Sequence, residues 1–157
     1  MRRWWSRMVL LVAAVVIAGA SLGCSSKSVE TGASAVTGAS SLWNSLGGST
    51  GVTNLANAFG QKISINPAVT KFLDSAAIDG AKNGLMNSIA AAAGQAMPAG
   101  STDLLGALQG KGLDAAAVKG VGDGLTAAAK DMKLKPDQVT ALTSLMEPVS
   151  KALLAGQ

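Results

Sequence analysis

The chain of 157 residues contains no histidine, no tyrosine and a single cysteine. Without histidine, it lacks the usual general base of serine and cysteine hydrolases and the commonest nitrogen ligand of metal ions. With one thiol, no disulfide can form within the chain, even in an oxidising compartment. Aromatic residues make up only 3% of the sequence and charged residues 14%, so stacking platforms and charged patches are scarce. These absences exclude many familiar forms of catalysis and recognition.

The acidic residues show no arrangement that indicates catalysis. Four lie where helix N-caps are expected: Asp79, Asp103, Asp114 and Asp137. Four others lack the paired spacing of acid–base catalysis or of a metal site: Asp74, Asp123, Asp131 and Glu147. We therefore predict that the chain is not an enzyme and holds no metal. An enzyme or maturation factor with a site not evident in the sequence is the alternative.

The first 23 residues follow the plan of a secretion signal. Three arginines lie in the first seven residues, an apolar run extends over residues 8–20, and small residues precede Cys24. The apolar run is shorter than the roughly 20 residues that a membrane-spanning helix needs. We predict that residues 1–23 are removed, with an uncleaved membrane anchor as the alternative.

Residues 21–24, Ser-Leu-Gly-Cys, resemble the lipobox of bacterial lipoproteins, in which a small residue precedes the acylated cysteine. Ser21 stands where that pattern usually has leucine. The resemblance implies that Cys24 carries the lipid, that it becomes the N-terminus of the mature chain, and that several acyl chains, such as palmitate, hold it to the membrane. Ser25 follows the cysteine, which by resemblance to Gram-negative sorting implies the cell envelope, at the periplasmic face of the outer membrane if the source is Gram-negative.

Removal of the signal changes the charge balance. It takes three arginines away and leaves ten lysines against nine acidic residues, a formal net charge of +1. No basic cluster interleaved with aromatic residues remains, so we predict no nucleic-acid partner. Residues 24–40 are rich in Ser, Gly, Thr and Ala and predict a flexible tether after the lipidated cysteine. Residues 41–157 then form a single folded domain.

The folded domain is predicted to be all-α, because its apolar residues recur at spacings of three and four rather than alternating. Helical segments are expected to begin at or beside six positions: Thr50, Pro67, Asp79, Asp103, Asp114 and Pro136. Asn66, directly before Pro67, is the expected N-cap of the second of these segments. A break is expected over residues 94–100. In the last helix the predicted inward positions are Val139, Leu142, Leu145, Val149 and Leu153. Pro148 is expected to kink or end this helix, at a cost of about 3 kcal/mol if unrelieved.

Three glycines fall within one predicted helix, at positions 120, 122 and 124. Each costs about 1 kcal/mol relative to alanine in a helix interior. They imply either close helix packing or local looseness, and the sequence does not choose between the two.

Residues 41–48, Ser-Leu-Trp-Asn-Ser-Leu-Gly-Gly, are similar to the S-L-Y-x-x-L-G-G opening of group 1 truncated (two-over-two) haemoglobins. Residues 59–73 are similar to that family's F-Y-x-x-V-x-x-D-P-x-L-x-x-F-F motif, and weaker likenesses follow at residues 88–94 and 134–153. The resemblance implies a truncated-globin-like helical bundle. A bundle that shares these helix-start signals by chance is the alternative.

The residues that hold haem in that family are missing. The family's A-H-x-G-x-G segment supplies the proximal histidine, and residues 107–112, Ala-Leu-Gln-Gly-Lys-Gly, place Leu108 at that position. Gly60, directly after Phe59, stands where the family has its ligand-stabilising tyrosine. Met86 carries a thioether, but a methionine at helical spacing is usually core filler. The would-be pocket positions are therefore Leu108, Gly60, Phe59 and Met86, and no cofactor is expected.

These observations favour a lipid-anchored protein whose globin-like domain has lost haem and acts as a binding or interaction module at the cell envelope. An envelope protein or a small apolar molecule is the expected partner, beside the membrane reached through Cys24. The alternative is residual binding of haem or of an oxygen-type ligand through an arrangement without histidine.

Overall fold

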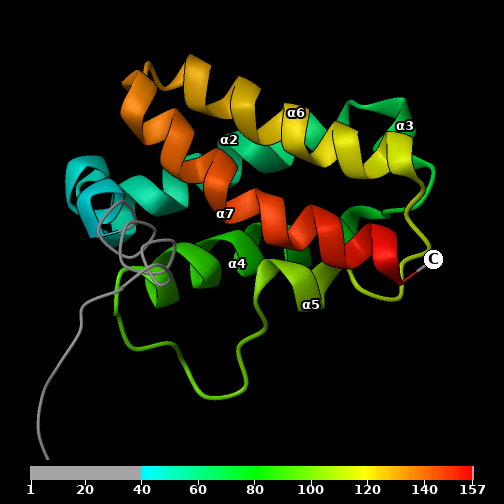
Figure 1. The fold of residues 1–157 in the computed structure, drawn as a ribbon, viewed down its shortest axis with the longest axis horizontal. Helices are drawn as coiled ribbons and strands as arrows, with labels where there is room; N and C mark the ends of the chain where they lie inside the picture. The colour runs from blue at the N-terminus through cyan, green and yellow to red at the C-terminus, as the bar shows by residue number, and fades with distance from the viewer. Residues whose placement is uncertain (1–39, 157) are drawn as a thin grey trace, which may run out of the picture.

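The computed structural model describes residues 40–156, so the predicted signal peptide, Cys24 and most of the tether lie outside the described residues. Within this range every regular element is a helix, which confirms the all-α prediction (Figure 1). A helical segment over residues 40–46 comes first. It is followed by α2 (Ser49–Ser64), α3 (Pro67–Thr70), α4 (Ser75–Ala92), α5 (Leu104–Leu108), α6 (Ala115–Asp131) and α7 (Pro136–Ala155).

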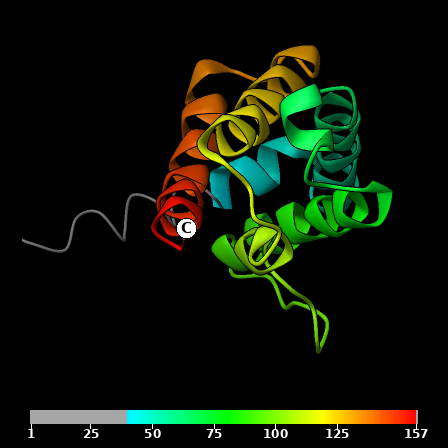
Figure 2. The same cartoon turned by 90° about the vertical axis from the view of Figure 1, so that its right-hand side faces the viewer.

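The four long helices pack in the order α4, α2, α6 and α7. Helix α2 contacts both α4 and α6, and α6 also contacts α7. The short helix α5 contacts α4 and α7, and α3 packs against α6. Figure 2 shows α6 and α7 on one side of the domain and α2 and α4 on the other. None of the helices in residues 40–156 combines the length and the apolarity needed to span a membrane.

Four helices begin at a residue whose side chain accepts a hydrogen bond from a backbone N–H of the first turn, as N-caps do. Three of these caps were predicted correctly: Asn66, Asp103 and Asp114. The cap of α4 was predicted wrongly, because Asp74 and not Asp79 fills it, accepting from Ala77 N at 2.8 Å. Ala77 and Ile78 already face the core, so the buried stripe of α4 starts one turn earlier than expected.

Asp79 and Asp137 both lie inside helices rather than at their caps. Asp79 lies in the second turn of α4, where its Oδ1 accepts a hydrogen bond from Lys82 Nζ at 2.9 Å. Helix α7 has Lys135 as its N-cap and Asp137 in its first turn. The Lys135 backbone N–H donates to Gln138 Oε1 at 2.7 Å, so the glutamine at the third helical position satisfies the N–H of the N-cap residue, as in a capping box.

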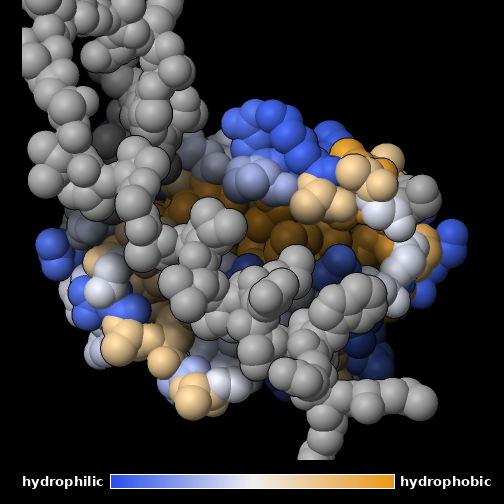
Figure 3. All heavy atoms as spheres, turned by 60° about the horizontal axis from the view of Figure 1, so that its bottom comes forward, coloured by the Kyte–Doolittle hydropathy of each residue, from blue (hydrophilic) through white to orange (hydrophobic). Residues whose placement is uncertain are grey.

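Apolar side chains alone fill the core of the described residues, where no polar or charged side chain is buried. Phe59 is its largest fully buried side chain. On the face turned forward in Figure 3, apolar residues are visible in a hollow beside hydrophilic residues. The absence of buried charge means that packing and hydrophobic burial hold the domain together.

Two of the three glycines of α6 serve close helix packing. A Cβ at Gly120 would lie 2.8 Å from Val69 Cγ2, and one at Gly124 would lie 2.7 Å from Ile63 Cγ2. Real Cβ atoms do not approach so closely, so glycine at these positions lets α2 and α3 lie directly on α6. Gly122 has open space around it. The structure therefore favours close packing over looseness at Gly120 and Gly124.

Helix α7 runs through Pro148 to Ala155, so the proline does not end it. Pro148 and Ser144, whose carbonyl loses its helical N–H partner, are both exposed, so water can hydrate that carbonyl. The buried positions of α7 are Leu142, Met146, Val149 and Leu153. Val139 and Leu145 were predicted to face inward; both are half-buried and pack against the core. Met146 is the buried residue at this turn in place of Leu145.

Candidate functional site

Leu108 is the last residue of α5 and packs into the apolar core with 1% of its surface exposed. The helix is fixed at its start by Asp103, whose Oδ1 accepts from Gly106 N at 2.8 Å. Leu104, one turn earlier, is equally buried and belongs to the same cluster. Leu108 therefore occupies its position as a hydrophobic core residue, and its side chain has no lone pair to offer a metal.

Gly60 lies at the contact between α2 and α4. A Cβ at this position would collide with the Cδ atom of Lys82 and would lie 2.7 Å from its Cγ atom. The aliphatic part of Lys82 therefore covers Gly60, while its ammonium group pairs with Asp79 on the same helix. A tyrosine at position 60 would have to displace Lys82, so the space of a distal tyrosine is already filled.

Phe59 and Met86 occupy different environments. Phe59 is fully buried in the core face of α2. Met86, on α4, is half-buried and lines an open groove on the outside of the domain. The four positions predicted from the globin resemblance thus do not line one common pocket in the described residues: two lie in the core, one lies at a helix contact and one faces this groove.

The groove that Met86 lines has a volume of about 690 Å³ and lies between α4, the loop that follows it, and α5. We call it the α4–α5 groove. Its lining residues are Gly80, Asn83, Met86, Asn87, Pro98, Ser101, Thr102, Gly106, Ala107, Gln109 and Lys111. Apart from Met86, sequence analysis singled out none of them as a site residue. Ala107, Gln109 and Lys111 lie in the segment matched to the A-H-x-G-x-G motif, but that match pointed to Leu108 alone, and most of the other lining residues come from two separate segments.

Two hydrogen bonds and one close contact hold the loop side of the groove against α4. Asn87 Nδ2 donates to the Thr102 carbonyl at 2.8 Å, and the Leu104 N–H donates to Ser88 Oγ at 3.0 Å. At Gly84 a Cβ would lie 2.8 Å from the Asp103 carbonyl oxygen, so only glycine lets the loop lie this close to α4. The groove is thus shaped before any ligand binds.

Comparison with profiles of known protein families, with curated proteins and with solved structures gave no match. We therefore infer function from the residues of this chain alone. In the described part of the chain, no group of three or more His, Cys, Asp or Glu side chains lies close enough to hold a metal ion. The remaining charged side chains lie on the surface.

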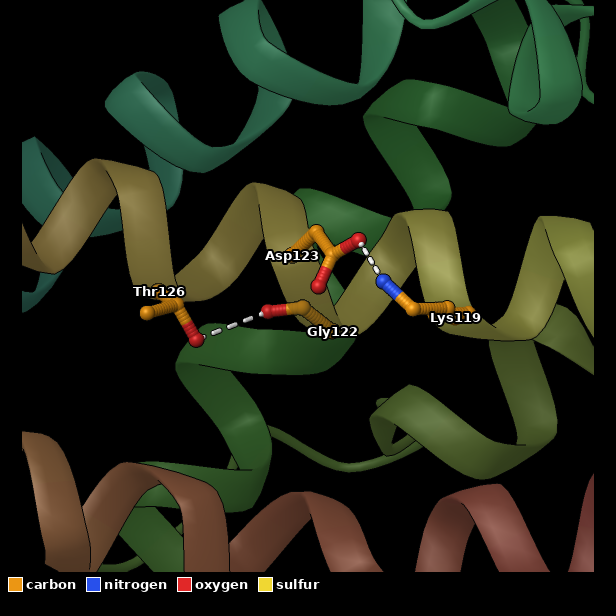
Figure 4. Close-up of polar contacts among 4 residues, drawn as sticks. All are labelled: Lys119, Gly122, Asp123 and Thr126. Carbon is orange, nitrogen blue, oxygen red and sulfur yellow. Dashed lines mark hydrogen bonds and ion pairs between the residues drawn. The ribbon is translucent and has the colours of Figure 1, made fainter.

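Three of the four ion pairs of the described residues join side chains three or four positions apart on one helix, and the fourth, between Lys62 and Asp131, joins α2 to α6. On α6, Lys119 Nζ lies 2.5 Å from Asp123 Oδ2, and Thr126 Oγ1 donates to the Gly122 carbonyl at 3.1 Å (Figure 4). Both Lys119 and Asp123 are more than half exposed, so their pairing is of the kind that stabilises a helix surface weakly. Nothing in this arrangement orients a group for acid–base catalysis.

Proposed function

We propose that this chain is a bacterial lipoprotein anchored through Cys24, and that its folded domain is a degenerate truncated globin serving as a binding or interaction module at the cell envelope. The observation that carries the proposal is Leu108. It stands where the resemblance places the proximal histidine, and it packs into the core as an ordinary leucine. A domain with this residue there does not bind haem in the ordinary way.

The arrangement of the helices supports the globin-like part of the proposal. The pairing of α2 with α4 and of α6 with α7 agrees with the two-over-two packing from which the family takes its name. The position of the distal tyrosine also supports the loss of haem, because the aliphatic stem of Lys82 covers Gly60, from which a tyrosine would point toward a ligand. Because the proximal histidine and the distal tyrosine are both missing, a role that no longer depends on haem is favoured.

The haem part of the proposal is tested by titrating the purified full chain with hemin. We expect a Soret band no different from that of free hemin in the same buffer, while a group 1 truncated haemoglobin stripped of haem shifts the band at near-unit stoichiometry. A saturable shift with this chain would overturn the proposal and support the alternative of haem binding without histidine. In that case Met86→Leu would show whether the thioether is the ligand.

The anchor is tested by growing cells that express the chain with radioactive palmitate. We expect label on the wild-type chain, and unlabelled, uncleaved precursor for Cys24→Ala. Ser25→Ala, which keeps the thiol, is the matched control and should be labelled like wild type. A wild-type chain that takes up no label would overturn the lipid anchor.

A further inference from the structure

The α4–α5 groove holds polar side chains that make no hydrogen bond within the described residues. Asn83 on α4, together with Gln109 and Lys111 after α5, lines the groove, and all three are exposed. By contrast, the side-chain amide of Asn87 already donates a hydrogen bond to the Thr102 carbonyl, in the loop that forms the groove wall. The groove therefore has a fixed frame and a set of free donors and acceptors around it.

We propose that the α4–α5 groove binds a short extended peptide segment that bears a carboxylate. This inference deepens the proposed function, on which it rests for the role of the domain as a binding module, and it names the chemistry of the partner. The peptide would come from another protein of the same compartment.

Charge argues for the carboxylate. Among the described residues, Lys111 is the only charged one that lines the groove. The nearby Asp103 carboxylate already accepts the Gly106 N–H at the start of α5. A carboxylate placed beside Lys111 would gain a charge-assisted hydrogen bond.

The two free amides argue for a peptide. A primary amide both donates and accepts, so Asn83 and Gln109 match the alternating N–H and C=O groups of an extended main chain. Met86, Ala107 and Pro98 also line the groove and supply apolar surface, which suits small side chains. The volume of about 690 Å³ lies in the range of ligand-binding clefts and holds only a few residues.

Because the loop is already held to α4 at Asn87, Ser88 and Gly84, binding would not require the groove to form. A preformed site loses less conformational entropy when a ligand is ordered in it. A short peptide can therefore bind measurably, although the groove is open on one side. We expect affinity in the millimolar range for a tripeptide.

The test is a titration of the ¹⁵N-labelled full chain, kept soluble in mild detergent, followed by amide chemical shifts. The probes are N-acetyl-tri-L-alanine and its C-terminal amide, which differ only in the carboxylate. We expect saturable shifts confined to residues of the groove, with the amide binding about tenfold more weakly, the effect of losing one charge-assisted hydrogen bond. Lys111→Gln should remove the difference between the two probes.

Two matched controls separate the groove from general effects of charge or polarity. Lys133→Gln removes an equal charge away from the groove and should leave both affinities unchanged. Asn57→Ala removes an exposed amide from α2 and should do the same, whereas Asn83→Ala should weaken both probes. Shifts that are absent, that lie outside the groove, or that respond equally to Lys111→Gln and Lys133→Gln would overturn the proposal.

The outcome is independent of the tests of the proposed function. A chain that fails to bind the peptides but takes palmitate and ignores hemin would lose only this inference. A chain that binds the peptides but takes no palmitate would keep the groove and lose the anchor.

Discussion

The contact of α6 with α2 and α3 and the α4–α5 groove use small residues in opposite ways. At Gly120 and Gly124 the missing side chain lets helices touch, and the core residues Val69 and Ile63 that lie against them are fully buried. In the loop beside the groove, Gly94, directly after the C-cap of α4, and Gly100, in the turn between Pro98 and Ser101, adopt positive φ angles of 72° and 79°. Apart from the close contact at Gly84, the glycines of the second region turn the loop rather than pack helices together, so stability should be concentrated in the first region and recognition in the second.

The largest expected difference between the two regions comes from shortening one side chain in each. Phe59→Ala should lower the free energy of unfolding by about 3–5 kcal/mol, because it leaves a cavity in the closed core. Met86→Ala should cost less than about 1.5 kcal/mol, because this side chain is already half-exposed in the groove. Urea unfolding followed by far-UV circular dichroism measures both, and equal losses would contradict the contrast between the regions.

A smaller difference in stability is expected between the alanine variants of two glycines that lie two residues apart on α6. Gly124→Ala should destabilise the chain by about 1–3 kcal/mol, since its Cβ would press on Ile63 and overpack the contact with α2. Gly122→Ala meets open space and should stabilise it by about 0.5–1 kcal/mol through helix propensity alone. Thermal unfolding of the two variants gives the comparison directly. If Gly124→Ala also raised the melting temperature, the contact would be looser than described.

Much of the closed region could be predicted from the sequence. The spacing of Val52, Leu55, Phe59 and Ile63 marks one face of a helix, and all four are buried in α2. The glycines of α6 can also be recognised in the sequence, but the residues that they contact cannot. Val69 and Ile63 lie more than 50 residues earlier in the chain, and only the tertiary path of α2 and α3 brings them to Gly120 and Gly124.

Helix starts were harder to predict where two residues compete for one role. Asp74 and Asp79 both precede apolar residues of α4, and the local pattern does not distinguish them. Leu73 decides the matter, because its burial ends the segment after α3 and leaves Asp74 in an extended conformation that suits a cap. In the same way, contacts with α6 and α5 turn Met146 inward and leave Leu145 half-exposed.

The groove could not be predicted because nothing in the sequence links its walls. Gly80 and Lys111, the first and last of its lining residues in the sequence, are separated by the rest of α4, a loop and α5. Its polar lining consists of Asn, Gln, Ser, Thr and Lys, types that occur on any protein surface. Only the fold, through the bonds of Asn87 and Ser88 to the loop, brings them around one hollow.

The smallest expected effect concerns an ion pair on the surface of α7, outside both regions. It tests whether surface charge contributes little to the stability of the domain. Lys151 Nζ donates to Glu147 Oε1 at 2.7 Å, and this hydrogen bond, with the attraction of the ammonium charge, lowers the pKa of the Glu147 carboxyl.

Because the folded-state pKa is the lower one, any stability that the pair provides is present above the ordinary carboxyl pKa and is lost as the pH falls through the lowered value. Lys151→Gln should return the Glu147 midpoint toward its ordinary value, measured from the ¹³C shift of the side-chain carboxyl, while Lys133→Gln should not. The unfolding free energy of Lys151→Gln at neutral pH should hardly differ from wild type, since both partners are mostly exposed and water screens their interaction. A clear loss of stability in Lys151→Gln, or a midpoint that stays low without the lysine, would mean that α7 depends on its surface charges more than on Leu142, Met146 and the apolar stripe that these residues begin.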